Sequence, residues 1–225
     1  MDAPFLVTMD GPAGVGKSTL AKHIAGAMGV AYLDTGAMFR TVAVGIFPQG
    51  TPLAGKELQE TLDSFGFALQ GSGENTGLLC NGRLVGSEIR TEEAGMRASR
   101  AGQIPEVRAF LKTAQQRLGA GFSLVAEGRD MGTVVFPEAQ CKLFLDAQPE
   151  ERARRRMLQL RETGIEESLE TLIVQIKARD DEDRNRPIAP LKPAPDAVIL
   201  DTSKLNIDEV FTVCMDAVRA AGWKG

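Results

Sequence analysis

Short apolar runs recur along this chain, and helical patterns separate most of them. Such runs predict buried strands, and they occur at Phe5–Val7, Ala31–Leu33, Leu124–Ala126, Lys142–Leu145 and Ala197–Leu200. After the first run, Leu20, Ile24 and Met28 recur every four residues, a spacing that places them on one face of a helix. Strands that alternate with helices form a parallel sheet flanked by helices, with ligands at the carboxyl ends of the strands. The pattern therefore predicts an α/β fold.

The middle of the chain follows a different pattern. Strand-like Phe65–Leu69 is followed by a glycine-rich break, and Asn81-Gly82 then separates two further short apolar runs. Asn-Gly between such runs is a strong signal for a β-hairpin. We therefore expect a small antiparallel sheet inserted between the two halves of the parallel one, followed by helices at about Glu92–Ala101 and Pro105–Leu118.

The last third of the chain predicts three helices. The first should open at Pro149 and run through Arg152–Arg161, break at Thr163-Gly164, and be followed by a second whose apolar stripe begins at Leu169. Arginine-bearing helices that join at a glycine are typical of a mobile cover over a phosphate site. In the final helix, Asn206 with Glu209 three residues later predicts a capping box.

The loop after the first strand carries the clearest chemistry. It reads Gly11-Pro12-Ala13-Gly14-Val15-Gly16-Lys17-Ser18-Thr19 and fits G-x-x-x-x-G-K-[ST], a nucleotide-phosphate loop, in the required strand–loop–helix context. Glycines let the backbone wrap around an anion, which successive N–H groups and the helix N-terminus attract. We expect Lys17 to reach the β- and γ-phosphates of ATP and the Ser18 hydroxyl to ligate Mg²⁺.

Composition narrows the classes of function. The net charge of −4 argues against bulk binding to nucleic acid. No apolar stretch is long enough to span a bilayer, and the three cysteines are scattered, so we expect a cytoplasmic protein with reduced thiols, no membrane partner and a monomeric state. The single histidine, His23, nearly excludes Ser/His/Asp catalysis. Arginines are concentrated in 152–161 and 179–186, which suits a phosphate-handling enzyme, although a solvated helix surface is the better explanation for most of them.

Four further motifs identify a family. They are Asp34-Thr35-Gly36-Ala37-Met38-Phe39-Arg40, Glu88-Ile89-Arg90-Thr91, Gly128-Arg129-Asp130-Met131-Gly132-Thr133 and the run from Arg179 to Arg186. With the phosphate loop, and in this order along nearly the whole chain, they closely resemble the bacterial cytidylate kinases. The resemblance implies a single P-loop kinase domain with a core at about 1–60 and 121–225, a monophosphate-binding insert at about 61–120 and a lid at about 150–168. It also implies the reaction of ATP with CMP or dCMP to give ADP and CDP or dCDP.

Site roles carry over from that resemblance position by position. Thr35, Arg40 and Arg129 would meet the α-phosphate of CMP, whereas Ser99, Arg108 and Asp130 would face the cytosine edge. Arg179 and Asp183 would lie near the sugar and phosphates, with Arg186 on the phosphate side. Lys17, Arg129, Arg179 and Arg186 would be the catalytic cations, with one or two of Arg152, Arg154, Arg155 and Arg156 added as the lid closes.

Physical chemistry supports the base assignment. A carboxylate can accept from the cytosine 4-amino group while a guanidinium donates to N3 and O2, and uracil would turn both contacts repulsive. Each role also has a simpler interpretation: Asp130 as a helix cap or partner of Arg129, Ser99 as an ordinary helix residue, and Arg179, Asp183 and Arg186 as a surface ladder on one helical face.

Two departures from the family pattern limit the carry-over. Phe39 stands where Tyr is frequent, and Glu127 stands where Asp is common, so a magnesium role for Glu127 through water is less secure. Two other functions stay open: a kinase for UMP, AMP or dTMP, and a slow ATP-dependent switch. The guanine-reading tetrapeptide N-K-x-D of GTPases is absent from the sequence.

Overall fold

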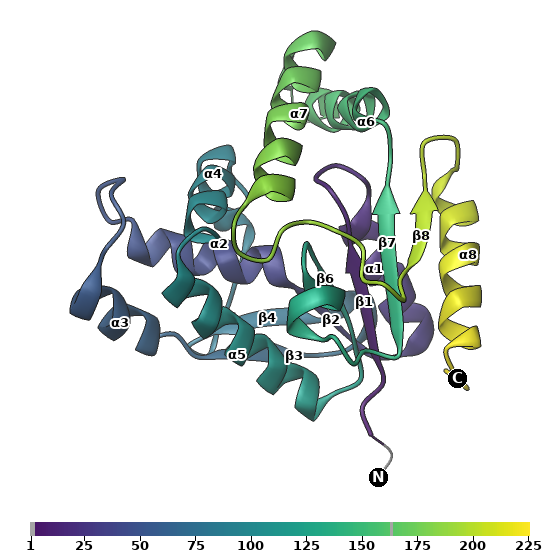
Figure 1. Ribbon diagram of the computed structural model, residues 1–225, viewed down its shortest axis with the longest axis horizontal. Coiled ribbons are helices and arrows are strands. Elements are labelled where there is room, and N and C mark those ends of the chain that lie inside the picture. Colours follow the sequence, from purple (N-terminus) through teal and green to yellow (C-terminus); the bar gives the residue numbers. More distant parts are fainter. Residues whose placement is uncertain (1–2, 163) are drawn as a thin grey trace.

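A five-stranded parallel sheet forms the centre of the protein, as the apolar runs predicted. The computed structural model describes residues 3–162 and 164–225. The strands are β1 (Leu6–Asp10), β2 (Ala31–Asp34), β6 (Leu124–Gly128), β7 (Cys141–Asp146) and β8 (Val198–Asp201). Their order across the sheet is β2-β6-β1-β7-β8, so β1 and the loop that follows it lie at the centre (Figure 1).

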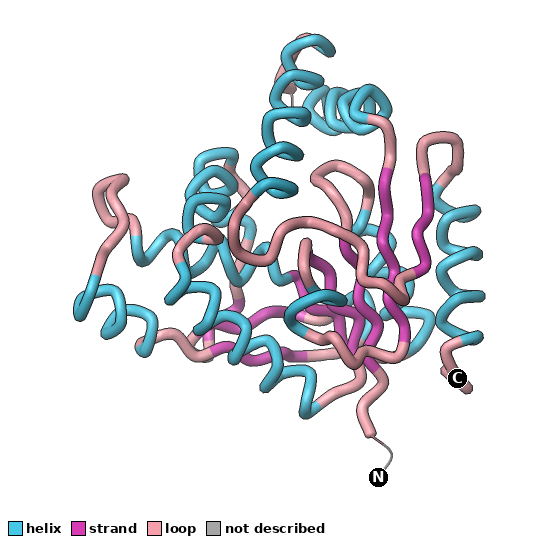
Figure 2. Tube along the Cα trace, in the orientation of Figure 1, coloured by secondary structure: helices cyan, strands magenta, loops and turns pink. Residues whose placement is uncertain are grey.

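Helices cover both faces of this sheet (Figure 2). On one face, α1 (Lys17–Met28) and α8 (Ile207–Ala220) pack against the strands in one apolar cluster. On the other, α2 (Thr35–Ile46), α3 (Gly55–Asp63) and α5 (Pro105–Gly121) contribute to a second cluster. The predicted face of α1 is buried, and the capping box at the start of α8 is present. The predicted α/β class is therefore confirmed.

The inserted antiparallel sheet is also present. It contains β3 (Phe67–Gln70), β4 (Gly77–Cys80) and β5 (Arg83–Leu84), with short 3₁₀ turns at Gly73–Asn75 and Ser87–Ile89. Asn81 and Gly82 have φ values of 51° and 76°, the left-handed conformation that the tight hairpin requires. The helix α4 (Glu92–Ala101) follows, with the bounds that the sequence predicted.

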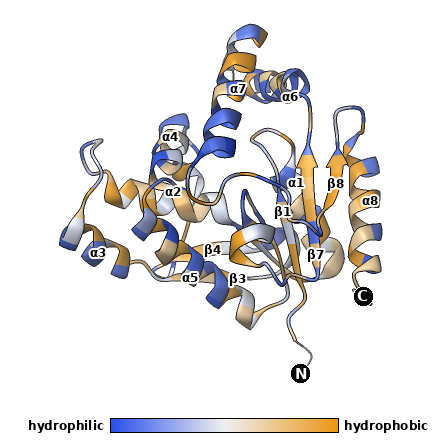
Figure 3. Ribbon diagram, viewed as in Figure 1, coloured by the Kyte–Doolittle hydropathy of each residue, from blue (hydrophilic) through white to orange (hydrophobic). Residues whose placement is uncertain are grey.

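Two helices project from the body above the sheet. These are α6 (Pro149–Glu162) and α7 (Leu169–Asn185), which share a small apolar cluster of their own around Ala153, Leu172 and Ile176. Of the predicted break, Thr163 lies outside the described residues, and Gly164 has a φ of 77°. The end of α7 that faces the sheet is strongly hydrophilic, whereas β7 and β8 are hydrophobic (Figure 3).

Several element boundaries differ from the sequence prediction, and two of these differences matter for the site. The first strand continues from Val7 to Asp10, because Thr8 and Asp10 are buried inside the sheet despite their polarity. Arg186 lies one residue beyond α7 in an extended conformation, so it does not continue the helical face of Arg179 and Asp183. No helix among residues 3–162 and 164–225 has both the length and the apolar character needed to cross a membrane.

Candidate active site

The strand register brings the polar strand ends to one edge of the sheet. Asp10 of β1 pairs in register with Gly128 of β6, and Asp34 of β2 pairs with Glu127. In parallel strands these carboxyl ends meet at a single edge, where ligands of open α/β sheets bind. The segments that leave this edge are the phosphate loop, the start of α2 and the Arg129-Asp130 turn. Three of the sequence motifs are therefore neighbours.

The phosphate loop depends on glycine at its first position. Gly11 has a φ of 147°, and a Cβ there would lie 2.1 Å from the Leu145 carbonyl oxygen, so the backbone leaves no room for a side chain. Gly14 and Gly16 also have positive φ, and among the described side chains none caps the N-terminus of α1. Its first amide groups stay available to an anion, which is the requirement of a phosphate site.

Lys17 is folded into the loop. Its Nζ donates to the carbonyl oxygens of Gly11, at 2.8 Å, and Pro12, at 2.7 Å. Burial and the nearby Arg129 guanidinium lower the pKa of Lys17 well below its usual range, against the opposing effect of Glu127 and Asp10. Backbone carbonyl oxygens thus hold the ammonium group within the loop.

A group of oxygen ligands lies beside Ser18. Glu127 is buried and accepts a hydrogen bond from the Tyr32 hydroxyl, and the Ser18 hydroxyl also interacts with this carboxyl group. Burial and the neighbouring Asp34 raise the pKa of Glu127. Hydroxyl and carboxylate oxygens are the ligands that Mg²⁺ prefers, so these residues fit a magnesium ion held chiefly by nucleotide phosphates.

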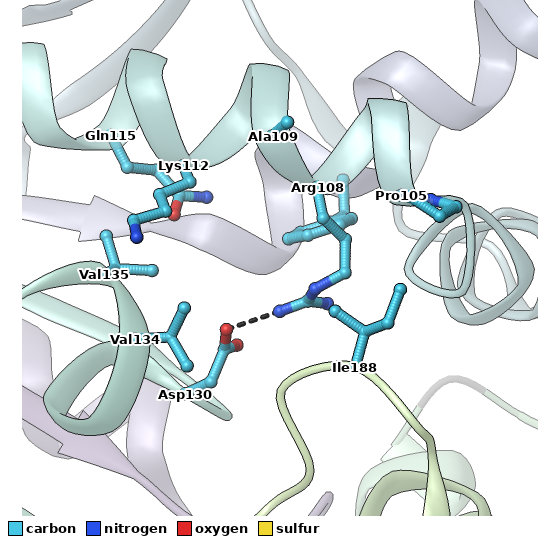
Figure 4. Close-up of a pocket in the computed structure, with 10 residues that line it drawn as sticks. Pro105, Arg108, Ala109, Lys112, Gln115, Asp130, Val134, Val135 and Ile188 are labelled. Atoms are coloured by element: carbon cyan, nitrogen blue, oxygen red, sulfur yellow. Dashed lines mark hydrogen bonds and ion pairs between the residues drawn. The ribbon is translucent and has the colours of Figure 1, made fainter.

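A cavity of about 230 Å³ lies between α5 and the turn that follows β6 (Figure 4). Arg108 and Asp130 both line it, and the Arg108 Nη2 donates to Asp130 across the cavity. The Arg108 guanidinium also lies 5.6 Å from the centre of the Phe39 ring. The remaining lining is largely apolar, with Val134, Val135 and Ile188 among its side chains. One carboxylate and one guanidinium in an apolar pocket suit a flat, polar-edged base.

Ion pairs extend from Asp130 toward α7. The Arg186 Nη2 lies 3.3 Å from the other oxygen of Asp130, and the Arg129 Nε donates to Asp183 at 2.8 Å. Burial alone would raise the pKa of Asp183, but Arg129, Arg179 and Arg186 outweigh it and lower the pKa. Asp130 therefore pairs with Arg108 and Arg186 rather than with Arg129, and it makes no side-chain cap for the helical turn Met131–Val135.

Three guanidinium groups, those of Arg40, Arg129 and Arg179, lie close enough to one another to interact electrostatically. Desolvation by the surrounding residues and the repulsion of Arg129 and Arg40 lower the pKa of Arg179, although this residue remains exposed, and the attraction of Asp183 partly opposes the change. Like charges placed together are costly unless an anion joins them, so this cluster favours a phosphate ligand. Thr35 lies beside the end of β6, because its hydroxyl donates to the Glu127 carbonyl oxygen at 2.6 Å.

Ser99 and Arg186 both contact acidic side chains in the structure. The Ser99 hydroxyl lies 3.4 Å from Glu182 on α7, and Ser99 is not among the residues that line the cavity. Arg186 donates to the Ala189 carbonyl oxygen at 2.6 Å and contacts Asp130. The substrate roles that the resemblance implies for both residues stay predictions.

Comparison with known proteins identifies the family. The cytidylate kinase family model matches residues 7–220. The cytidylate kinase of Nitratidesulfovibrio vulgaris, strain Hildenborough, is 55% identical over 215 residues, which cover 96% of this chain and 93% of that protein. The chain belongs to the cytidylate kinase family.

Other relatives extend the same finding across bacteria. The cytidylate kinase of Maridesulfovibrio salexigens is 54% identical, covering 94% of this chain and 95% of that protein. That of Serratia proteamaculans is 46% identical, covering 92% and 90%. An uncharacterized protein from Eubacterium ventriosum shares the fold, with a TM-score of 0.53 at 12% identity, over 96% of this chain and 98% of that one.

Two buried polar residues near the site of this cytidylate kinase family member were not predicted from the sequence. Gln115 lines the cavity two helical turns after Arg108 and is almost fully buried. Asp10 accepts hydrogen bonds from the backbone amides of the two residues that follow Asp130, Met131 at 2.9 Å and Gly132 at 2.8 Å. The sequence held one signal for Asp10, an acidic residue at the end of a buried strand next to the phosphate loop.

The burial of Asp10 predicts a pH-dependent stability. Burial raises the pKa of Asp10 from 3.8 to about 6, although the two amide hydrogen bonds oppose the rise. At pH values between these two pKa values, the folded state binds more protons than the unfolded state. The contribution of Asp10 to the free energy of unfolding therefore decreases as pH rises from about 4 to about 6. We expect the unfolding free energy of wild type, relative to Asp10→Asn, to fall by up to about 3 kcal/mol between pH 4 and pH 7. Urea unfolding of both proteins at pH 4 and pH 7 measures this difference. A difference in unfolding free energy between wild type and Asp10→Asn that stays the same at both pH values would contradict the prediction.

Proposed function

We propose that this kinase transfers the γ-phosphate of ATP to CMP or dCMP, giving ADP and CDP or dCDP. The observation that carries the proposal is the shared edge of the sheet, where the phosphate loop adjoins the Arg108–Asp130 pair. The loop suits a triphosphate donor, and the buried pair matches the cytosine edge. Family membership over residues 7–220 supports the same reaction.

ATP would occupy the loop of residues 11–19. Lys17 would leave the Gly11 and Pro12 carbonyl oxygens for the transferring phosphate, and the loop amides would hold the other phosphate oxygens. Ser18 would hold Mg²⁺, with Glu127 behind it. The ion, when bound, would supply charge neutralisation at the nucleotide phosphates. Residues of this chain would therefore position both the ATP donor and the acceptor nucleotide.

The acceptor would lie between the cation cluster and the cavity. Arg40 and Arg129, with the Thr35 hydroxyl, would meet the α-phosphate of CMP, and Arg179 and Asp183 would lie near the sugar and the phosphates. The monophosphate is already largely dianionic at neutral pH, because its second pKa is about 6, so it needs positioning and charge neutralisation rather than a base. The cation cluster supplies both.

The cavity would hold the base. Asp130 would accept from the 4-amino group and Arg108 would donate to N3 and O2, with Ser99 completing the contacts at the base, whereas Arg186 would lie on the phosphate side. For Arg186 to reach the phosphates, its ion pairs with Asp130 and Asp183 would have to open. The proposal also includes a lid at about 150–168, an insert at about 61–120, a monomeric state and a cytoplasmic location.

Substrate competition tests this proposal. With ATP and Mg²⁺, we expect ADP to form rapidly with CMP or dCMP and slowly with UMP, AMP or dTMP, because Arg108 and Asp130 complement only the cytosine edge. A coupled assay for ADP, with each acceptor offered separately, measures the preference. Equal or faster turnover of another monophosphate would keep the kinase and overturn the base assignment, whereas ATP hydrolysis indifferent to every acceptor would favour a switch.

A further inference from the structure

Arg152 on α6 is the most deeply buried arginine of the helices above the sheet. Its side chain is 1% exposed, and it lies against the outer side of the phosphate loop, with its Cβ 3.5 Å from the position that a Gly14 Cβ would take. Arg154 and Arg156 on the same helix are exposed instead. The sequence left the roles of these arginines open, and burial now separates them.

Four hydrogen bonds fix the Arg152 guanidinium. The Nε donates to the Ala147 carbonyl oxygen at 2.9 Å, and the Nη1 donates to the Ala13 carbonyl oxygen at 3.2 Å. Asp180 of α7 accepts from Nη1 at 2.9 Å and from Nη2 at 2.5 Å. A bidentate pair of this kind holds a guanidinium in one orientation. Arg152 therefore joins α6, α7 and the phosphate loop, and its donors are already committed to protein acceptors.

The contact with Ala13 has a consequence for the loop. The Ala13 carbonyl and the Gly14 N–H belong to one planar trans peptide and point in opposite directions. Because the carbonyl oxygen is held on the Arg152 side, the Gly14 N–H points away from α6, toward the side on which the loop motif places the phosphates. Arg155 repeats this arrangement: its Nη1 lies 3.4 Å from the Val15 carbonyl oxygen, opposite the Gly16 N–H.

The same arginine fixes where the two projecting helices meet the body. The helices α6 and α7 share an apolar cluster separate from the two clusters on the main sheet. The Arg152–Asp180 pair lies at the base of this two-helix unit, on the wall of a cleft of about 550 Å³ that also contains Asp146 and Asp201. Loss of the pair would free both the loop peptide and the position of the helices.

We propose that Arg152, held by Asp180, is a positioning residue that aims the Gly14 amide into the phosphate loop and so sets the affinity for the nucleotide donor. It acts through the backbone and does not touch the transferring phosphoryl group. The proposal rests on the proposed function, since it takes this loop as the donor site. It leaves the exposed arginines of this helix, Arg154 and Arg156 among them, to reach the phosphates.

Two conservative variants test the proposal. Arg152→Lys keeps the charge but removes the planar fork, and Asp180→Asn keeps the shape of the partner but removes its charge. In calorimetric titrations we expect each variant to bind ADP about tenfold more weakly than wild type, the loss typical of a charge-assisted hydrogen bond. The Kd for CMP should stay within about twofold of the wild-type value, because the acceptor contacts lie elsewhere. In assays, the KM for ATP should rise while the KM for CMP does not.

The control is Arg219→Lys, because Arg219 is an exposed arginine paired with Asp216 at 3.0 Å on α8. It should leave both Kd values unchanged. Equal weakening of ADP and CMP binding, with a lower melting temperature, would overturn the proposal in favour of a purely structural role, and so would unchanged ADP binding. If Arg152→Lys does not fold, Asp180→Asn decides on the same readouts. The turnover of wild type with CMP tests the proposed function separately. The proposal for Arg152 depends only on the Kd values of the variants relative to those of wild type.

Discussion

Lys17→Ala is expected to reduce turnover about 10³-fold while CMP binding persists, the scale of losing one preorganised electrostatic donor. The physical reason is the position of Nζ, which lies buried within the loop on the carbonyl oxygens of Gly11 and Pro12. Without it, no described side chain in the loop opposes the charge on the transferring phosphate. Single-turnover kinetics with ATP and CMP measure the loss, and calorimetry measures the Kd for CMP.

Folding must be separated from chemistry in that experiment. Lys17→Met keeps most of the buried stem and removes only the ammonium group, so it should match Lys17→Ala in turnover while unfolding closer to wild type. Loss of CMP binding with intact ADP binding would contradict the site map, because it would place Lys17 at the acceptor. Turnover within about tenfold of wild type would remove Lys17 from catalysis.

Asp130→Asn is expected to narrow the preference for CMP over UMP by about 100-fold. Asp130 is buried and acceptor-only, whereas an asparagine amide can also donate to the uracil 4-oxygen. Buried polar groups left unpaired by the wrong base support large discrimination, so relieving the mismatch should raise kcat/KM for UMP and lower it for CMP. The ratio of the two kcat/KM values is the measurement.

The ion pairs of Asp130 complicate this variant. Arg108 and Arg186 both contact Asp130, so Asp130→Asn leaves two buried guanidinium groups with less opposing charge and should also lower stability. Asp196→Asn is a matched control, since Asp196 pairs with the buried Lys142 away from the cavity. It should leave the base preference unchanged. An unchanged preference in Asp130→Asn as well would show that this carboxylate does not read the base.

Local pattern determined much of this protein. Apolar runs located all five strands of the parallel sheet, and Asn81-Gly82 located the hairpin, because side-chain period and turn chemistry are properties of neighbouring residues. Glycine spacing located the phosphate loop for the same reason. The apolar run predicts too short a first strand, because Thr8 and Asp10 are polar and become buried only when the whole sheet has formed.

The tertiary structure decided which charges meet. Arg108 and Asp130 are 22 residues apart, Tyr32 and Glu127 are 95 apart, and Arg152 reaches Ala13 across 139 residues. Such pairs depend on the order and register of the strands, which local spacing does not encode. The sequence by itself therefore determined the residue types and the loop that we propose to bind nucleotide. Only the packed sheet determined that Asp130 faces Arg108 and Arg186, and that Arg152 is fixed beneath the phosphate loop, because burial and partner choice arise when distant segments pack together.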